Sequence, residues 1–228
     1  MALDNWEHPA YHLNMIGDNL LRFKPHQKYV VFDCETCNLN LLDVRNCPWQ
    51  WGWKVCTLKE TISESDYLVQ WPEIAISKDA QELTGFYQRR VDEEGKSPEF
   101  VLAEFEKVLY DPQYLLIAHN ALNFDVYLHQ IHRKLLGKPI NYDYLPRLLD
   151  TNALARAWRL NSHPKEGEDR LSFQYKFANL YVKGIKTSLR VLAPEFNIEY
   201  DAKAAHDAMY DVRVLHQVWQ QLVYKLEI

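Results

Sequence analysis

The sequence predicts an α/β domain built around a mixed β-sheet, and three features indicate it. Residues 28–36, KYVVFDCET, contain a continuous apolar run that is typical of a strand buried on both faces. Strand-like stretches at residues 49–58 and 67–71 follow over short connections, which indicates an antiparallel meander. Further along, short apolar runs alternate with helical patterns, which indicates parallel strands joined by helices.

Composition limits the number of domains and the class of protein. The chain has 228 residues, 47% hydrophobic and 25% charged, which is enough for one sizeable core. Its formal net charge of -5 argues against a cationic protein that coats duplex nucleic acid. Residues 1–27 are interpreted as an N-terminal extension with a short helix near residues 14–22, and residues 28–228 as a single domain. Because the sequence shows neither a secretory signal nor a membrane-spanning run, we expect a cytoplasmic protein without a membrane partner.

The first predicted strand ends in two acidic residues. Side chains alternate along a strand, so Asp33 and Glu35 point the same way while Cys34 points into the opposite layer. Neighbouring carboxylates at the end of a buried strand repel each other, and burial disfavours the charge of both. A divalent cation such as Mg²⁺, which prefers hard oxygen ligands, would stabilise them. The alternative is that both acids mark the point where a strand meets solvent.

All four cysteines lie within one short stretch, at Cys34, Cys37, Cys47 and Cys56. Four thiolates satisfy tetrahedral zinc, so a zinc site is one interpretation. We favour reduced, packed thiols, because Cys34 is expected to face away from the strand end and Cys56 lies in an apolar strand-like run.

The middle of the chain is polar and then helical. Residues 77–87 form a polar segment with a turn at Gly85, and residues 89–98, rich in charge, are interpreted as a loop or linker. Pro98 then opens an amphipathic helix that ends at Asp111.

A second buried strand is predicted at residues 114–118, followed by an amphipathic helix over residues 124–135. His129 and His132 have a metal-compatible spacing on that helix, but no third ligand accompanies them, so we expect them on a solvated face. Residues 145–149 predict a further short strand.

The last part of the chain is mostly helical. Asp150 is expected to cap a helix, and short and long helices are predicted at residues 187–194 and 204–226. Residues 159–183 are interpreted as an insertion. From residue 156 to 190 there are eight basic and three acidic residues, interleaved with aromatics. This pattern suits single-stranded nucleic acid, and a solvated loop with ordinary core aromatics is an equal alternative.

Two further acids follow predicted elements in a way that suggests convergence. Asp125 begins the helix after the second buried strand, and Asp211 lies on the final helix. In an open α/β sheet, the carboxyl ends of strands and the adjoining helix starts line one crevice. Asp33, Glu35, Asp125 and Asp211 can therefore meet there. Four carboxylates would hold two divalent cations about 4 Å apart, an arrangement suited to phosphodiester displacement.

A histidine precedes the last of these acids. On an unbroken helix, His206 and Asp211 would point roughly 140° apart, so His206 must lie in the loop before the helix to face the same crevice. Asp207 fits as the helix cap. A histidine in that place can accept a proton from an attacking water.

Three segments resemble, in order, the motifs of the DnaQ-like (DEDDh) 3'-5' exonucleases. They are FDCET at residues 32–36, AHNALNFD at 118–125 and HDAMYD at 206–211. Weaker similarities are the Thr84-Gly85 pair, LLDT at 148–151 and the SLRVLAPEFNI stretch. The extension, the CxxC pattern and the 159–183 insertion depart from the family.

The resemblance implies a ribonuclease H-like fold, with a mixed five-stranded sheet and flanking helices. It also implies that two Mg²⁺ or Mn²⁺ ions are held by a set of four acids and that His206 is the general base. It further places a set of four residues near the terminal nucleotide or its supporting loop. The metal ligands are Asp33, Glu35, Asp125 and Asp211. The substrate-binding set is Thr36, Asn38, Leu39 and Asn120.

The implied activity is metal-dependent removal of 5'-mononucleotides from the 3' end of DNA, preferably single-stranded. Expected partners are single-stranded DNA or RNA 3' ends and, for a proofreading nuclease in DNA replication, a DNA polymerase. The expected location is the cytoplasm of a bacterial or phage-infected cell. Three alternatives stay open: an exoribonuclease or oligoribonuclease of the same family; an HD-type nucleotide phosphohydrolase using His206 and Asp207; and a non-catalytic nucleic-acid-binding module.

Overall fold

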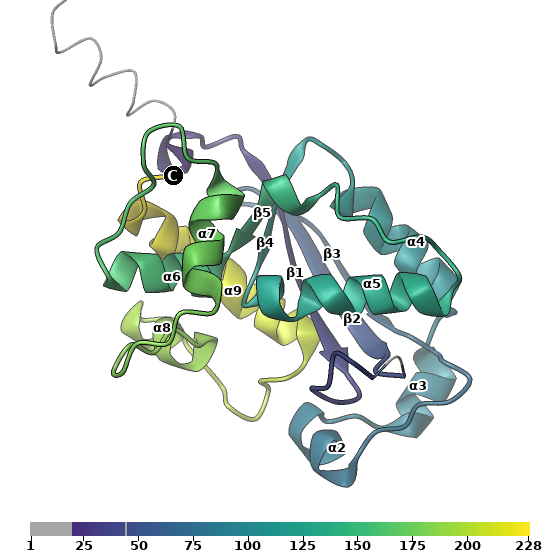
Figure 1. The fold of residues 1–228 in the computed structure, drawn as a ribbon. Coiled ribbons are helices and arrows are strands. Elements are labelled where there is room, and N and C mark those ends of the chain that lie inside the picture. The colour runs from purple at the N-terminus through teal and green to yellow at the C-terminus, as the bar shows by residue number, and fades with distance from the viewer. Residues whose placement is uncertain (1–19, 44) are drawn as a thin grey trace, which may run out of the picture.

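The computed structural model describes residues 20–43 and 45–228, which fold around a five-stranded sheet in the order β3-β2-β1-β4-β5 (Figure 1). The strands are β1 Lys28–Thr36, β2 Pro48–Cys56, β3 Thr61–Leu68, β4 Tyr114–Ala118 and β5 Leu148–Asp150. β1, β2 and β3 form an antiparallel meander, whereas β4 and β5 run parallel to β1. The predicted mixed α/β sheet is therefore confirmed. The helix predicted near residues 14–22 lies mostly outside the described residues.

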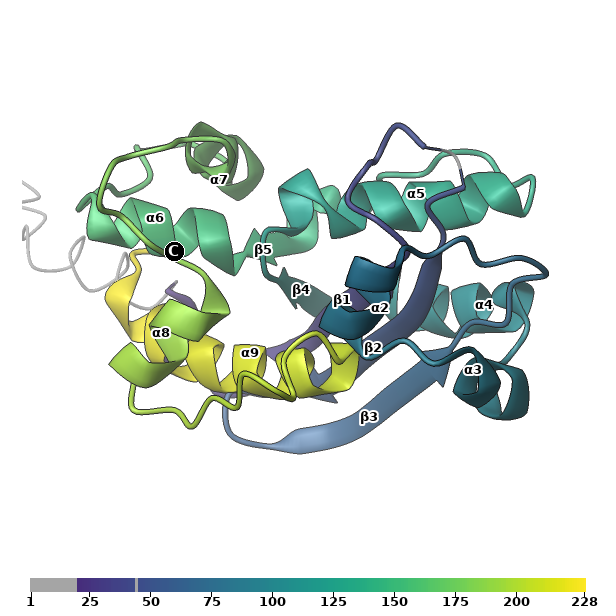
Figure 2. The ribbon, with the colours of Figure 1, turned by 90° about the horizontal axis from the view of Figure 1, so that it is seen from below.

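Helices cover both faces of the sheet (Figure 2). One face carries α4 Pro98–Leu109 and α5 Asp125–Leu135, and the other carries α9 Ala208–Leu222. In β1, Tyr29 packs on Trp219 of α9 with ring centroids 5.8 Å apart, and Phe32 packs on Phe105 of α4 at 5.3 Å. The central strand is thus buried from both sides, as its apolar run predicts.

The charged run at residues 89–98 is not a simple loop, so that prediction is wrong. The segment from residue 77 folds into two short helices, α2 Lys78–Thr84 and α3 Gln88–Glu94. The hydroxyl of Ser77 accepts a hydrogen bond from the amide of Ala80 and caps α2. In α3, Val91 is buried, and Arg89 and Arg90 each pair with a glutamate four residues on. These local pairs and one apolar contact favour a helix that a charge count does not reveal.

Two strand boundaries also differ from the prediction. The third strand begins at Thr61 rather than near residue 67, because it is an edge strand whose polar residues, such as Glu64, need no apolar run. The last strand is shorter than residues 145–149. A 3-10 turn, η3 Leu145–Arg147, precedes β5.

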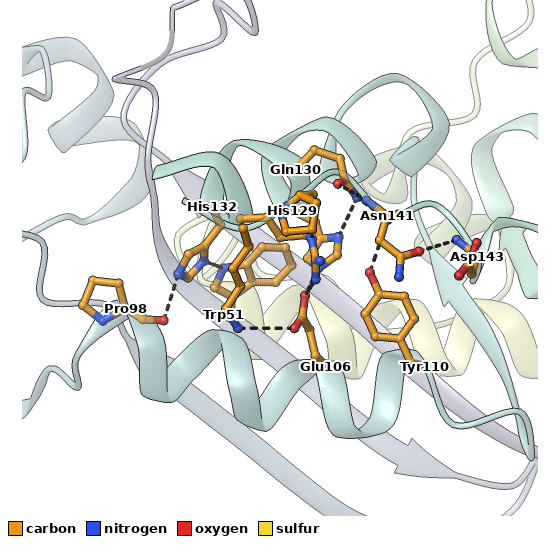
Figure 3. Close-up of polar contacts among 12 residues, drawn as sticks. Trp51, Pro98, Glu106, Tyr110, His129, Gln130, His132, Asn141 and Asp143 are labelled. Carbon is orange, nitrogen blue, oxygen red and sulfur yellow. Dashed lines mark hydrogen bonds and ion pairs between the residues drawn. The ribbon is translucent and has the colours of Figure 1, made fainter. Parts of the chain in front are cut away.

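His129 and His132 are not on a solvated face, and this prediction is wrong. Their side chains are buried between α4, α5 and β2 (Figure 3). Nε2 of His129 lies 3.1 Å from a carboxylate oxygen of Glu106. His132 bridges Trp51 and the carbonyl of Pro98. Polar groups can be buried here because each finds a hydrogen-bond partner.

The remaining helices are α6 Thr151–Arg159, α7 Arg170–Ala178 and α8 Leu189–Glu195. α7 lies within the segment 159–183 and packs on β5. The carboxamide of Gln174 accepts from the amide of Asp150 at 2.6 Å and donates to the carbonyl of Leu148 at 3.0 Å, which attaches α7 to that strand. None of the helices in the described ranges is both long and apolar enough to cross a membrane.

Candidate active site

The three motif segments meet in one cleft of about 530 Å³ at the carboxyl end of β1. β1 supplies two acids, the first residue of α5 a third, and the loop and first turn of α9 the remaining acid and histidine. All five predicted catalytic residues line it, namely Asp33, Glu35, Asp125, His206 and Asp211. The topology explains this convergence, because β1 and β4 are parallel neighbours and α9 packs across β1.

Three of these residues approach each other closely. Glu35, His206 and Asp211 each offer an atom able to bind a metal, and these atoms lie within 4.8 Å of one another. Asp211 Oδ2 accepts a hydrogen bond from the backbone amide of His206 at 3.1 Å. Its Oδ1 is buried and has no hydrogen-bond partner among the described residues. A buried carboxylate oxygen without a partner is costly, which suggests that a ligand completes it.

Burial and mutual repulsion perturb the carboxylates. The pKa values of Asp33 and Glu35 are raised, first by burial and then by the charges of neighbouring acids that include Asp125 and Asp211. Burial raises the pKa of Asp125 to about 7, against hydrogen bonds that lower it. Burial likewise raises the pKa of Asp211. The cleft therefore concentrates negative charge that is poorly solvated.

This set fits a divalent cation. Carboxylate oxygens are the hard ligands that Mg²⁺ and Mn²⁺ prefer, and a cation would relieve both the repulsion and the unpartnered Oδ1 of Asp211. A bound divalent cation would also lower the pKa values of these carboxylates, because its positive charge favours their ionised form.

A family model described as RNase_T, exonuclease, matches residues 30–219. The chain belongs to this exonuclease family. The resemblance drawn from the three motifs is thereby confirmed, and the HD-type phosphohydrolase alternative is wrong. No curated protein sequence matches the chain.

Solved structures of E. coli exonuclease I have a similar fold. The complex with a dT13 oligonucleotide matches with a TM-score of 0.62 and 16% identity, over 86% of this chain and 41% of that chain. The dA16 complex matches with a TM-score of 0.59 and 14% identity, over 87% and 42%. A zinc-bound complex with single-stranded DNA matches with a TM-score of 0.62 and 16% identity, over 87% and 40%. The chain thus spans about two fifths of the length of these structures.

In this member of the exonuclease family, His206 lies in the loop before α9, as expected. Its φ of 68° places it in the left-handed region, which is uncommon for a residue with a side chain. Asp207 is the N-cap of α9 and accepts from the amide of Tyr210 at 3.0 Å. The strained turn and the cap together direct His206 and Asp211 to the same cleft.

Sequence reasoning did not single out Gln50 and Gly52 of β2. Gln50 is fully buried; its Nε2 donates to Asp66 at 2.9 Å and to Asp207 at 3.2 Å, and its Oε1 accepts from the amide of Ala208 at 3.3 Å. A Cβ on Gly52 would lie 2.9 Å from backbone atoms of Ala208. The start of α9 therefore sits directly on β2. The sequence does contain a signal for this close packing, because a glutamine and a glycine interrupt the aromatic strand PWQWGWKVC.

Cys34 also contributes to the site. Its side chain faces the layer opposite Asp33 and Glu35, but α5 lies in that layer, and the thiol donates to Asp125 Oδ1 at 3.4 Å. Burial raises the pKa of this thiol, with the charge of Asp125 as the next cause. The neutral thiol thus acts as a hydrogen-bond donor to the acid.

The predicted substrate-binding residues Thr36, Asn38, Leu39 and Asn120 line the same cleft. Leu39 is 82% exposed. Asn120 has a φ of 64° and begins a 3-10 turn, η2 Ala121–Asn123. His119 lines the cleft as well, although sequence reasoning did not select it.

Asp150 supports the loop that carries Asn120. Its carboxylate accepts from the amides of Asn120 and Leu122, each at 3.0 Å, and from the first amides of α6. The predicted cap is confirmed, and the same carboxylate fixes the turn leading to Asp125.

Proposed function

We propose that this exonuclease removes nucleotides from the 3' end of single-stranded DNA and releases 5'-mononucleotides. The observation that carries the proposal is the meeting of four acids and His206 in one cleft. The fold likeness to exonuclease I structures that hold dT13 and dA16 oligonucleotides supports the choice of substrate.

Two divalent cations, Mg²⁺ or Mn²⁺, would be held by Asp33, Glu35, Asp125 and Asp211. When bound, such ions neutralise charge on the phosphate and stabilise the attacking and leaving oxygens. The acids supply the ligands, and the cleft presents them already gathered. Without cations, the same charges would repel a phosphodiester.

His206 would act as the general base. It is exposed, so an attacking water can reach its imidazole, and an atom of its ring lies within 4.8 Å of a carboxylate oxygen of Glu35 and of Asp211. Its backbone amide is fixed by Asp211 Oδ2. The imidazole nitrogen would accept the water's proton as the water approaches the phosphorus atom.

The terminal nucleotide would lie against Thr36, Asn38, Leu39 and Asn120. The exposed Leu39 offers an apolar surface to a base, and the amide side chains offer donors and acceptors for sugar and phosphate. We further propose that residues 28–228 form one exonuclease domain with an insertion at 159–183.

A gel assay tests the function. 5'-labelled single-stranded DNA and an RNA of the same sequence are incubated with the protein and Mg²⁺, with EDTA and His206→Ala as controls. We expect a ladder that shortens from the 3' end on DNA and is lost in both controls. A ladder on RNA but not on DNA would show that the substrate is RNA and not DNA. No ladder on either would contradict the proposed activity.

A further inference from the structure

The four cysteines are buried and unbridged, and they separate into different environments. Cys34 contacts Asp125, and Cys56 lies opposite Tyr29 at the far end of the β1–β2 pair. Only Cys37 and Cys47 meet. A zinc site formed by all four thiols is therefore not present in the described residues.

Cys37 follows β1 directly, and Cys47 directly precedes β2. Their sulfur atoms lie 3.4 Å apart, and the Cys37 thiol also lies 3.2 Å from the carbonyl oxygen of Cys47. The two residues form the neck of the loop 38–46. This loop carries Asn38 and Leu39, which line the active-site cleft.

The neck is held in place by contacts that do not involve the thiols. The side-chain oxygen of Asn46 accepts from the hydroxyl of Thr36 and from the amide of Asn38, the latter at 3.1 Å. A disulfide needs a sulfur–sulfur distance of about 2.0 Å, so the two sulfurs must approach by only about 1.4 Å.

The two thiols differ in access and in acidity. Cys47 lines a second cavity of about 480 Å³, together with Arg45 and Trp71, whereas Cys37 is completely buried. The hydrogen bond between the two thiols lowers the pKa of Cys47. Of the two residues, Cys47 is the one that lines a cavity and whose pKa is lowered, so we assign the first oxidation to its sulfur.

We propose that Cys37 and Cys47 are an oxidisable dithiol that hydroperoxides convert into a disulfide, closing the loop 38–46 covalently. The Cys47 thiolate attacks one peroxide oxygen, the O–O bond breaks, and a sulfenic acid and hydroxide form. The Cys37 sulfur then attacks the sulfenic sulfur, the S–O bond breaks, and water leaves with the thiol proton. The two sulfurs lose two electrons in all, and hydrogen peroxide is reduced to two waters.

The test treats the full chain with hydrogen peroxide, alkylates the remaining thiols after unfolding, and maps tryptic peptides without reduction. Trypsin places Cys37 in residues 29–45, Cys47 in 46–54 and Cys56 in 55–59. We expect one cross-linked pair, 29–45 with 46–54, about 2 Da lighter than the two peptides together. Fragment ions between Cys34 and Cys37 identify the bonded sulfur. Dithiothreitol should restore all four thiols.

The matched variants are Cys47→Ser, which should leave Cys37 alkylatable, and Cys56→Ser, which should cross-link as the wild type does. The wild-type map decides the question even if a variant folds poorly, provided that circular dichroism shows the oxidised protein still folded. Three results would overturn the proposal. They are a disulfide to Cys34, sulfinic acid at Cys47 without a cross-link, and oxidation of Cys56 to the same extent as Cys47.

Discussion

The indole nitrogen of Trp51 donates a hydrogen bond to Nδ1 of His132, with 3.2 Å between the two nitrogens (Figure 3). On the other side of the ring, Nε2 lies 2.9 Å from the carbonyl oxygen of Pro98 and donates to it. The imidazole is therefore neutral, because a proton on Nδ1 would face the N–H of Trp51. The contact joins β2 to α5, the helix that begins at Asp125.

This contact predicts a loss of stability in acid. Burial lowers the pKa of His132 from 6.5 to about 3. Between these values the unfolded chain binds the proton and the folded chain does not, so the free energy of unfolding falls as the pH falls below 6.5. The loss approaches about 1.4 kcal/mol per pH unit from this residue. Urea denaturation between pH 7.5 and 4.5 measures it.

The variant His132→Gln should reduce that pH slope, because a carboxamide can accept from Trp51 and donate to Pro98 without titrating. His163→Gln, at an exposed position, is the matched control and should keep the wild-type slope. An unchanged slope in His132→Gln would show that other groups cause the acid sensitivity.

The acidic cleft predicts the opposite dependence for the metal-free protein. Asp33, Glu35, Asp125 and Asp211 have raised pKa values, so these groups hold protons in the folded state at pH values at which they are ionised in the unfolded chain; for Asp125 this window runs from about pH 4 to about pH 7. Their contribution to stability therefore falls as the pH rises through this window. Mn²⁺ at a fixed concentration of about 100 times its Kd at pH 8 should raise the free energy of unfolding by about 2.7 kcal/mol at pH 8. The same concentration should raise it much less at pH 5.

Thermal unfolding in EDTA and in MnCl₂ at the two pH values measures this effect. Asp33→Asn should remove the shift caused by Mn²⁺, and Asp143→Asn, at an exposed position, should retain it. A shift of equal size at both pH values, or in Asp33→Asn, would exclude the cleft as the binding site.

Asp211→Asn should separate activity from stability. The amide removes a charge next to Glu35, so the metal-free variant should be about 1 kcal/mol more stable at pH 8. Turnover on a labelled oligonucleotide should fall on the order of 10³-fold. Asp201→Asn, at an exposed position, is the control. Turnover within tenfold of the wild type would contradict a role for Asp211 in catalysis.

Gln50→Leu tests the contact between the start of α9 and β2. The leucine leaves the amide of Ala208 and the carboxylates of Asp66 and Asp207 without their shared partner, at a cost of about 1–3 kcal/mol. We also expect lower kcat with little change in KM, because the loop carrying His206 loses its support. Gln88→Leu, on the exposed side of α3, is the matched control. Wild-type kcat in Gln50→Leu would show that the loop is held by other contacts.

The sequence by itself determined the central strand, the order of the three motifs and the five candidate catalytic residues, all of which line the cleft. These follow from local signals, since an apolar run, a turn and a helix start are each encoded by a few neighbouring residues. The cap at Asp207 and the loop position of His206 followed from helix geometry, given that His206 and Asp211 face the same crevice.

Only the tertiary structure decided which polar residues are buried. The sequence pattern led us to expect His129 and His132 on a solvated face, yet α4 and β2 cover them and supply Glu106, Trp51 and Pro98 as partners. Likewise, the importance of Gln50 depends on α9, which is about 160 residues away in the chain. A local pattern records hydrophobicity, whereas burial of a polar group depends on partners from distant segments that only the complete fold brings together.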